Sequence, residues 1–154
     1  MNRTTRYQGA IIQDGRILLV HTHLRSTGER FWLLPGGGRE DGESEEACVQ
    51  RELLEETCLE VHVERLLLEE PGPPGGVYRR MKTYLCRPIG GEAHPGYEPV
   101  EGGVDDFENA AGDFQIVEVR WFDLRDESGW DPEMRADPIT YPAVQSVRRV
   151  LGYL

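Results

Sequence analysis

Apolar residues concentrate in two stretches near the start of the chain, residues 6–13 and 16–21, on either side of Asp14 and Gly15. An Asp-Gly pair between two such stretches indicates a tight β-hairpin turn, because both residues tolerate the positive φ angles that this turn requires. The pattern therefore predicts that a β-sheet begins with this hairpin.

The second stretch ends in His21 and His23, which a strand would place on one side of a sheet. Two imidazoles at this spacing form either part of a transition-metal site or the rim of a substrate site. No further Cys or His partner is patterned nearby, so the rim is the favoured interpretation.

The rest of the chain continues the alternation of apolar segments and breaks. A polar loop at residues 24–30 and a Pro/Gly break at 71–76 separate the segments, and further strands are predicted at 31–34, 60–69, 77–88 and 115–124, with a closing helix at 139–151. The stretch 89–113 is rich in glycine and acid and lacks periodicity, so it is either a mobile lid over the site or a disordered surface loop. No repeat or linker is visible, and we expect a single domain over 1–154.

Between these strands, a glycine turn at residues 35–38 leads into an acidic segment with the spacing of a helix. Glu52, Glu55 and Glu56 stand at i, i+3 and i+4, so a helix places them on one face, where like charges repel. A hard divalent cation such as Mg²⁺, which prefers oxygen ligands, would relieve that repulsion. The alternative is an ordinary solvated acidic face, with Arg51 pairing to Glu55.

The predicted helix also carries signals for its start and its packing. Ser44 suits the N-cap, and acidic residues follow it at the positive end of the helix. Ala47, Leu54 and Cys58 form an apolar stripe opposite the carboxylates. This stripe predicts a helix that packs on the sheet with its acidic edge open to a cleft.

Composition limits the classes of function. The 154 residues contain 17 Lys and Arg against 28 Asp and Glu, a net charge of −11, which argues against a broad nucleic-acid-binding face. A small polyphosphate is compatible with this charge because bound divalent cations reverse its local sign. No apolar run is long enough for a membrane span and the start lacks a secretory segment, so we expect a cytoplasmic protein without membrane contact. The three cysteines, Cys48, Cys58 and Cys86, are expected to be reduced and structural.

The acidic segment resembles the signature of the Nudix hydrolases, G-x5-E-x7-R-E-U-x-E-E-x-G-U, where U is apolar. Eight of its nine specified positions match, namely Gly37, Glu43, Arg51, Glu52, Leu53, Glu55, Glu56 and Leu59. Cys58 stands where the family has glycine. A glycine there supplies a left-handed turn, which cysteine adopts with strain, so we expect an altered helix exit.

The resemblance implies an α/β fold, an α/β/α sandwich with a mixed central sheet, and a Mg²⁺-dependent hydrolase that also accepts Mn²⁺. Its ligands would be the Gly36 carbonyl with the three glutamates Glu52, Glu55 and Glu56. Arg51 would hold the carboxylates in place, and Glu43 would support the helix start. Glu52, Glu55 or a loop residue would act as base. Arg25, Arg30 and Glu108 are candidate substrate contacts, and for the two arginines the alternative is solvated loop positions.

The resemblance also leaves points open. Family members often carry a further catalytic glutamate six residues before a tryptophan, and counting back from Trp121 reaches Gln115. Either Glu108, Asp113 or Glu118 supplies the carboxylate instead, or the function is reduced. Pro74 hints weakly at ADP-ribose. A nucleotide sugar, a dinucleoside polyphosphate and a nucleoside triphosphate remain equally open as substrates. The alternatives to a nucleotide hydrolase are a hydrolase of a non-nucleotide diphosphate and a non-catalytic nucleotide-sensing module. The sequence does not indicate the oligomeric state, and the resemblance leaves a homodimer open because dimers are frequent among relatives.

Overall fold

The first two strands form a hairpin around the predicted turn. β1 (Thr5–Gln13) and β2 (Arg16–Leu24) run antiparallel. Asp14 and Gly15 between them have φ angles of 53° and 74°, the left-handed conformation that both central residues of a tight hairpin turn adopt. The predicted origin of the sheet is confirmed.

One mixed sheet forms the centre of the molecule. The computed structural model describes residues 4–96 and 114–154. Its further strands are β3 (Arg30–Leu33), β4 (Gly36–Gly37), β5 (Glu60–Pro71), β6 (Arg80–Gly90) and β7 (Phe114–Asp123). Their order is β3-β2-β1-β6-β5, with β4 paired to β1 and β7 to β2. β1 and β6 run parallel and the other described pairs run antiparallel, so the predicted mixed sheet is confirmed.

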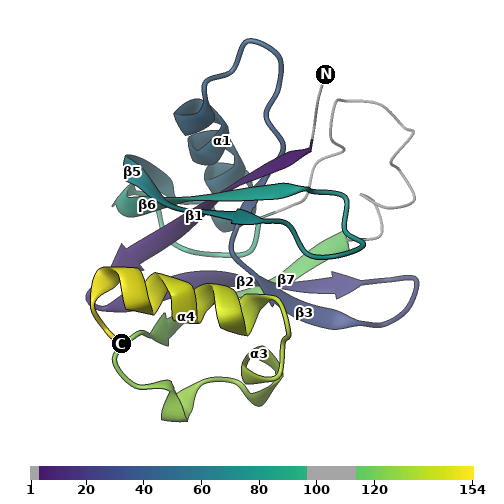
Figure 1. Ribbon diagram of the computed structural model, residues 1–154, viewed down its shortest axis with the longest axis vertical. Coiled ribbons are helices and arrows are strands. Elements are labelled where there is room, and N and C mark those ends of the chain that lie inside the picture. The colour runs from purple at the N-terminus through teal and green to yellow at the C-terminus, as the bar shows by residue number, and fades with distance from the viewer. Residues whose placement is uncertain (1–3, 97–113) are drawn as a thin grey trace.

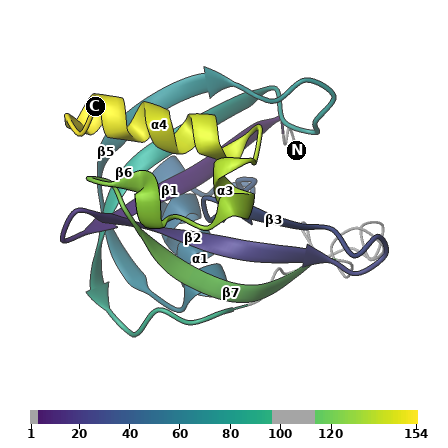
Figure 2. The ribbon, with the colours of Figure 1, turned by 90° about the horizontal axis from the view of Figure 1, so that it is seen from below.

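Helices cover both faces of this sheet. Figure 1 shows α1 (Glu45–Thr57) on one side and α4 (Thr140–Leu151) on the other, which gives the predicted α/β/α arrangement. Figure 2 looks at the α4 side, where the short helices η3 (Glu127–Gly129) and α3 (Pro132–Arg135) lie beside α4. Among the described residues, no helix is long and apolar enough to cross a membrane.

Each face of the sheet has its own apolar cluster, because successive strand residues point to opposite sides. The cluster under α1 includes Tyr7, Ile11, Leu18, Cys48, Val49, Leu53 and Cys86. The cluster under α4 includes Ala10, Ile17, Leu19, Trp32, Phe122, Trp130, Val144 and Val147. We call these two sides the α1 face and the α4 face.

The strands on either side of the Pro/Gly break differ from their predicted bounds, because β5 ends two residues later and β6 begins and ends later than predicted. β5 and β6 remain paired from Glu60 opposite Gly90 to Pro71 opposite Arg80, with three irregularities in register. Pairing along this whole length extends both strands beyond their apolar stretches. The stretch predicted to be either a lid or a surface loop therefore begins only after Gly90, and its residues 97–113 lie outside the described residues.

The end of α1 keeps the left-handed turn that a glycine would supply, so the predicted change of the helix exit was wrong, and only the strained φ angle of the cysteine is present. Cys58 caps the helix with a φ angle of 64°, in the left-handed region, and its N–H donates to the Leu54 carbonyl at 3.0 Å. The segment after β6 completes the cap, since the N–H of Gly96 donates to the Glu56 carbonyl at 2.9 Å. A Cβ on Gly96 would lie 1.8 Å from the Glu55 carbonyl oxygen, so this close approach requires glycine.

The described cysteines form no disulfide, as predicted. Cys48, Cys58 and Cys86 are free thiols, and Cys48 and Cys86 are buried. Burial raises the pKa of the Cys86 thiol to about 12, which keeps it protonated and unreactive near neutral pH.

Candidate active site

The glycine turn is pressed between β1 and α1. Gly36 and Gly37 form β4, which pairs with β1 at Gln8 and Tyr7. A Cβ on Gly36 would lie 2.4 Å from the Tyr7 carbonyl oxygen, and one on Gly37 would lie 2.6 Å from the carboxylate carbon of Glu52. Glycine is therefore required here by space, and the turn brings bare backbone against a predicted metal-binding glutamate.

The helix begins as predicted and is tied to the sheet at its first residue. The Ser44 hydroxyl accepts a hydrogen bond from the Ala47 N–H at 3.1 Å. Glu45 then accepts from Lys82 at 3.1 Å and from the Tyr84 hydroxyl, both on β6. Burial alone would raise the pKa of Glu45, but these two hydrogen bonds outweigh it and lower the pKa. The carboxylate thus anchors the start of α1.

The side of α1 that faces the sheet differs from the prediction. The buried residues are Cys48, Val49, Glu52, Leu53, Glu56 and Thr57. Glu52 is 1% exposed and Glu56 is 0% exposed, while Leu54, which we expected to pack on the sheet, is 48% exposed. The predicted apolar stripe was wrong, because two of the three carboxylates lie on the packed face beside the glycine turn.

Arg51 joins the acidic residues of the helix to the loop before it. Its Nε and Nη2 donate to the two carboxylate oxygens of Glu43, at 2.7 and 2.9 Å. Its Nη1 contacts Glu52 Oε1 at 3.0 Å and Glu55 Oε2 at 3.5 Å, and Nη2 also donates to the Gly38 carbonyl at 3.2 Å. A planar guanidinium with five donors suits such a junction. The structure thus brings Arg51 and Glu43 together with two predicted ligands.

The charges of this junction shift its ionisation. The hydrogen bonds from Arg51 hold the pKa of Glu43 below its ordinary value, against the opposing effect of burial. In return, the Glu43 carboxylate raises the pKa of Arg51. Both groups are therefore ionised throughout the neutral range.

The oxygen atoms around the turn fit a hard divalent cation. Glu52 and Glu56 lie on the same face of α1, and the N–H of Gly36 donates to Glu56 Oε1 at 3.3 Å. Within residues 4–96 and 114–154, no three His, Cys, Asp or Glu side chains already stand in the arrangement of a metal site. Carboxylates and a backbone carbonyl are nevertheless the oxygen ligands that Mg²⁺ prefers. The donor set therefore matches the predicted cofactor in its chemistry.

An aromatic pair on the α1 face was missed by the sequence reasoning. Phe31 on β3 and Phe114 on β7 meet edge to face, with ring centroids 6.2 Å apart. Phe31 and Ile116 are the register partners of Thr22, which lies on the same side of β2 as Leu18 of the α1 face. Phe114 stands two residues before Ile116 and so points to the same side of β7. Both rings therefore lie on the α1 face. The pairing of β2 with β7 has a bulge between His21 and Thr22. The bulge interrupts the alternation of sides along β7, so the sequence alone does not indicate the face on which Phe114 lies.

Gln115 and Glu118 lie on the other face of the sheet. Gln115 is exposed and pairs with His23, while Glu118 pairs with His21 and contacts Arg120 at 2.7 Å. Neither side chain is brought to α1. The other two predicted sources of a carboxylate, Glu108 and Asp113, lie outside the described residues.

The two predicted phosphate-binding arginines are not brought together with the glutamates. Arg25 is exposed, and its Nε donates to the Gln115 amide oxygen at 3.4 Å. Arg30 is exposed at the start of β3, opposite His23. Their roles in substrate binding stay predictions.

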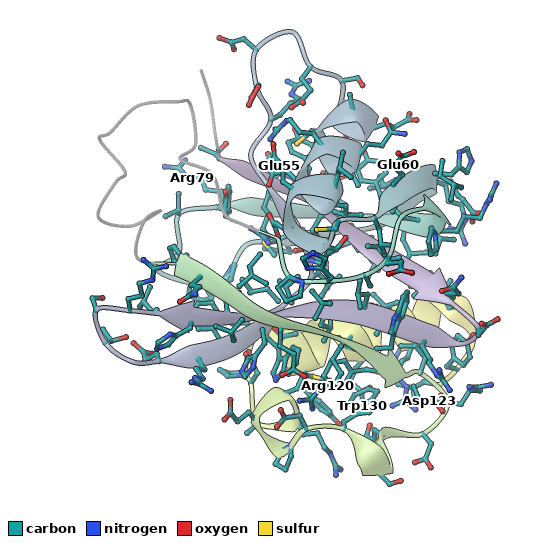
Figure 3. All side chains as sticks on the ribbon, turned by 180° about the vertical axis from the view of Figure 1, so that it is seen from behind. Glu55, Glu60, Arg79, Arg120, Asp123 and Trp130 are labelled. Atoms are coloured by element: carbon teal, nitrogen blue, oxygen red, sulfur yellow. The ribbon has the colours of Figure 1, made fainter. Side chains whose placement is uncertain are left out.

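His21 is packed into the α4 face and is not at a rim. Its ring stacks on Trp32 at 4.2 Å, and its Nε2 lies 3.3 Å from Glu133 Oε2 on α3. The Arg120 guanidinium lies over the Trp32 ring, 5.0 Å from the ring centre. Figure 3 shows Glu55 on the α1 side and Arg120 with Trp130 on the opposite side, so His21 is separated from the acidic cluster by the sheet. The rim prediction was therefore wrong for His21, whereas His23 is half-buried and the prediction for it stays a prediction.

The mixed sheet lies between two helices, and its α1 face has a glycine turn beside buried glutamates. Together these features define the Nudix class of fold. The sequence profile of the NUDIX domain matches residues 3–143, and the chain therefore belongs to this family of pyrophosphohydrolases.

Solved structures share the fold at low sequence identity. A crystal structure of an ADP-ribose pyrophosphatase from Streptococcus suis 89-1591 has a TM-score of 0.65 and 23% identity, over 97% of this chain and 92% of that one. A crystal structure of a MutT NUDIX hydrolase from Burkholderia pseudomallei has a TM-score of 0.58 and 24% identity, over 96% of this chain and 99% of that one. A UDP-X diphosphatase has a TM-score of 0.65 and 21% identity, and this chain spans 64% of its length.

Proposed function

We propose that this protein hydrolyses a phosphoanhydride bond in a nucleoside diphosphate linked to another group, with Mg²⁺ or Mn²⁺ as cofactor. The family membership implies a nucleotide diphosphate substrate. The proteins with similar folds are named for ADP-ribose, for UDP-X compounds and as MutT. The group attached to the diphosphate is therefore left to experiment. A cytoplasmic location and a homodimer stay predictions.

The burial of Glu52 and Glu56 carries this proposal. Their side chains are almost fully covered, side by side on one helix face. Covering two carboxylates costs free energy through lost hydration and mutual repulsion, unless positive charge offsets it. Arg51 offsets part of this cost at Glu52, and a divalent cation, which is often the largest local charge in a site, would provide further positive charge.

The chain's own groups have distinct roles in the proposed reaction. Glu52, Glu55, Glu56 and the Gly36 carbonyl would hold the cation, which when bound neutralises phosphate oxygens and makes a water more nucleophilic. Arg51 keeps Glu52 and Glu55 oriented, and Glu43 orients Arg51 in turn. Glu55 is the more exposed of the three glutamates. It is therefore the one best placed to take a proton from water.

The aromatic pair supports a planar leaving group. Phe31 and Phe114 are half-buried on the α1 face, at the starts of β3 and β7. Exposed ring surface of this kind binds planar groups by stacking and apolar contact. We propose that it contacts the part of the substrate attached to the diphosphate.

A substrate panel with Mg²⁺ tests the proposal. The panel contains ADP-ribose, a nucleotide sugar, a dinucleoside polyphosphate, nucleoside triphosphates and a non-nucleotide diphosphate, each with and without chelator. We expect chelator-sensitive release of product from one class, and release at least ~100-fold slower from Glu56→Gln. Metal-dependent binding without product release would instead identify a nucleotide-sensing module.

A further inference from the structure

The chain entering the glycine turn is held at two consecutive carbonyl groups by β1. The Gly9 N–H donates to the Pro35 carbonyl at 3.0 Å. Arg6 Nη2 donates to the Leu34 carbonyl at 2.8 Å. Leu34 precedes by two residues Gly36, whose carbonyl is the proposed metal ligand. The position of that carbonyl thus depends on contacts made just before it in the chain.

Arg6 is itself oriented by a short series of buried polar groups. Its Nε donates to Gln8 Oε1 at 3.2 Å, and Gln8 Nε2 donates to Thr83 Oγ1 at 2.9 Å. Gln8 is 3% exposed and Thr83 is 2% exposed. The guanidinium also lies over the ring of Tyr78, 5.9 Å from its centre. Buried hydrogen bonds between fixed partners select one direction for a planar side chain.

These contacts reach from β6 through β1 to the turn, and they lie on the side of β1 away from α1. Gln8 and Arg6 alternate with Tyr7, which belongs to the α1 face. The turn is therefore supported from both sides of the sheet. Glu56 contacts Gly36 on one side, and Arg6 holds Leu34 on the other.

We propose that Arg6 is a positioning residue for the metal-binding turn, oriented by Gln8 and Thr83. This inference rests on the proposed function, because it assigns Arg6 to the site through the Gly36 carbonyl. Arg6 acts on the peptide backbone and not on the substrate. Two of its N–H groups donate at once, to Gln8 and to the Leu34 carbonyl, and a single ammonium group does not reproduce this pair with the same geometry.

Metal binding by two matched variants tests the proposal without substrate. Arg6→Met and Arg80→Met each remove one guanidinium from the same end of the paired strands β1 and β6, so each lowers the net charge of −11 by one. Arg80 is 55% exposed and pairs with Glu69 at 2.6 Å, away from the turn. Mn²⁺ affinity is measured by electron paramagnetic resonance and Mg²⁺ affinity by calorimetry, and kcat and KM follow.

We expect Arg6→Met to weaken cation binding roughly 10-fold, the typical effect of losing a group that orients a ligand. The sign is diagnostic, because loss of positive charge near the site would by Coulomb's law strengthen cation binding. We also expect a lower kcat with KM changed less than about twofold, since the substrate contacts remain. Arg80→Met should leave metal affinity and kcat within about twofold of the wild type.

Arg6→Lys keeps the charge but replaces the separated donor nitrogens of the guanidinium by one ammonium nitrogen, so its metal affinity should lie between those of Arg6→Met and the wild type. Arg6→Lys is the test if Arg6→Met does not fold. Metal affinity in Arg6→Met equal to that of Arg80→Met, or tighter, would overturn the proposal. Wild-type protein that binds metal and hydrolyses substrate, with an unaffected Arg6→Met, removes this inference alone. Wild-type protein that binds no metal removes the proposed function and this inference with it.

Discussion

Both faces of the sheet have an apolar cluster, but they differ in what is buried beside it. On the α4 face, Trp32, Phe122 and Trp130 form a chain of edge-to-face rings, with centroids 5.0 and 6.1 Å apart. On the α1 face, Glu52 and Glu56 are buried beside glycine backbone. Interlocked rings stabilise a fold, whereas buried carboxylates cost stability. The comparison indicates that the α4 face stabilises the fold, whereas the α1 face accommodates the buried carboxylates that the proposed reaction requires.

The largest expected effect is on stability, from a change on the α4 face. Phe122→Ala should lower the free energy of unfolding by about 3–5 kcal/mol, because it opens a cavity between two rings. Turnover per folded molecule should stay within about threefold of the wild type, because the ring lies across the sheet from α1. Urea unfolding and kcat at low temperature check the two parts. Phe122→Leu leaves a smaller cavity and replaces the alanine variant if that variant does not fold. Lost turnover in folded protein would contradict the assignment of fold stability to the α4 face and of catalysis to the α1 face.

The reverse effect is expected from Glu56→Gln on the α1 face. Turnover should fall at least ~100-fold, the typical weight of an electrostatic catalytic group. The free energy of unfolding should be unchanged or higher, because a buried amide costs less than a buried carboxylate. Glu46→Gln makes the same change of charge at an exposed position of α1 and is the control. Near-normal turnover in folded Glu56→Gln would remove the metal-site assignment.

A smaller effect, dependent on pH, is expected from Glu43→Gln. Arg51 holds the pKa of Glu43 below its ordinary value of 4.5. A carboxyl whose pKa is lowered by folding stabilises the protein above its unfolded pKa, and this contribution is lost as the pH falls through the folded pKa. We expect Glu43→Gln to cost about 1.5–3 kcal/mol at pH 7, as for other charge-assisted hydrogen bonds, and progressively less below pH 4.5.

Unfolding free energies of the wild type and Glu43→Gln, measured in urea across the acid range, give this difference directly. Glu46→Gln again controls for the loss of one negative charge on the helix. A difference that stays constant down to the lowest pH at which the protein folds would contradict the ion pair with Arg51 as its cause.

The smallest effect is expected at the end of α1. Cys58→Gly should raise the free energy of unfolding by roughly 0.5–1 kcal/mol, because glycine adopts the φ angle of 64° without strain. Thermal unfolding measures this gain. Cys58→Ala removes the thiol and keeps the Cβ, so it should give no gain, and an equal gain in both variants would assign the effect to the sulfur.

The features that could be predicted from the sequence are those that depend on neighbouring residues in the chain. The hairpin at Asp14 and Gly15, the cap at Ser44 and the glycine turn each depend on backbone preferences of a few adjacent residues. The packed side of α1 depends on tertiary burial, and a carboxylate such as Glu56 gives no sign in its own sequence that it will be covered. The face of Gln115 was equally hidden, since one bulged residue in a strand exchanges the two sides that follow.

The parallel pairing of β1 with β6 has a consequence for how the chain acquires its structure. Gln8 and Thr83, which meet in this pair, are 75 residues apart, whereas β1 and β2 meet across a two-residue turn. Closing so long a loop is entropically costly, and contacts of this kind form slowly. During synthesis, the hairpin and α1 therefore become available before β6 does, and one edge of β1 stays open in the interval. An open edge is a template for pairing with another chain. We therefore expect the time between the emergence of α1 and that of β6 to be the period in which this protein most depends on chaperones.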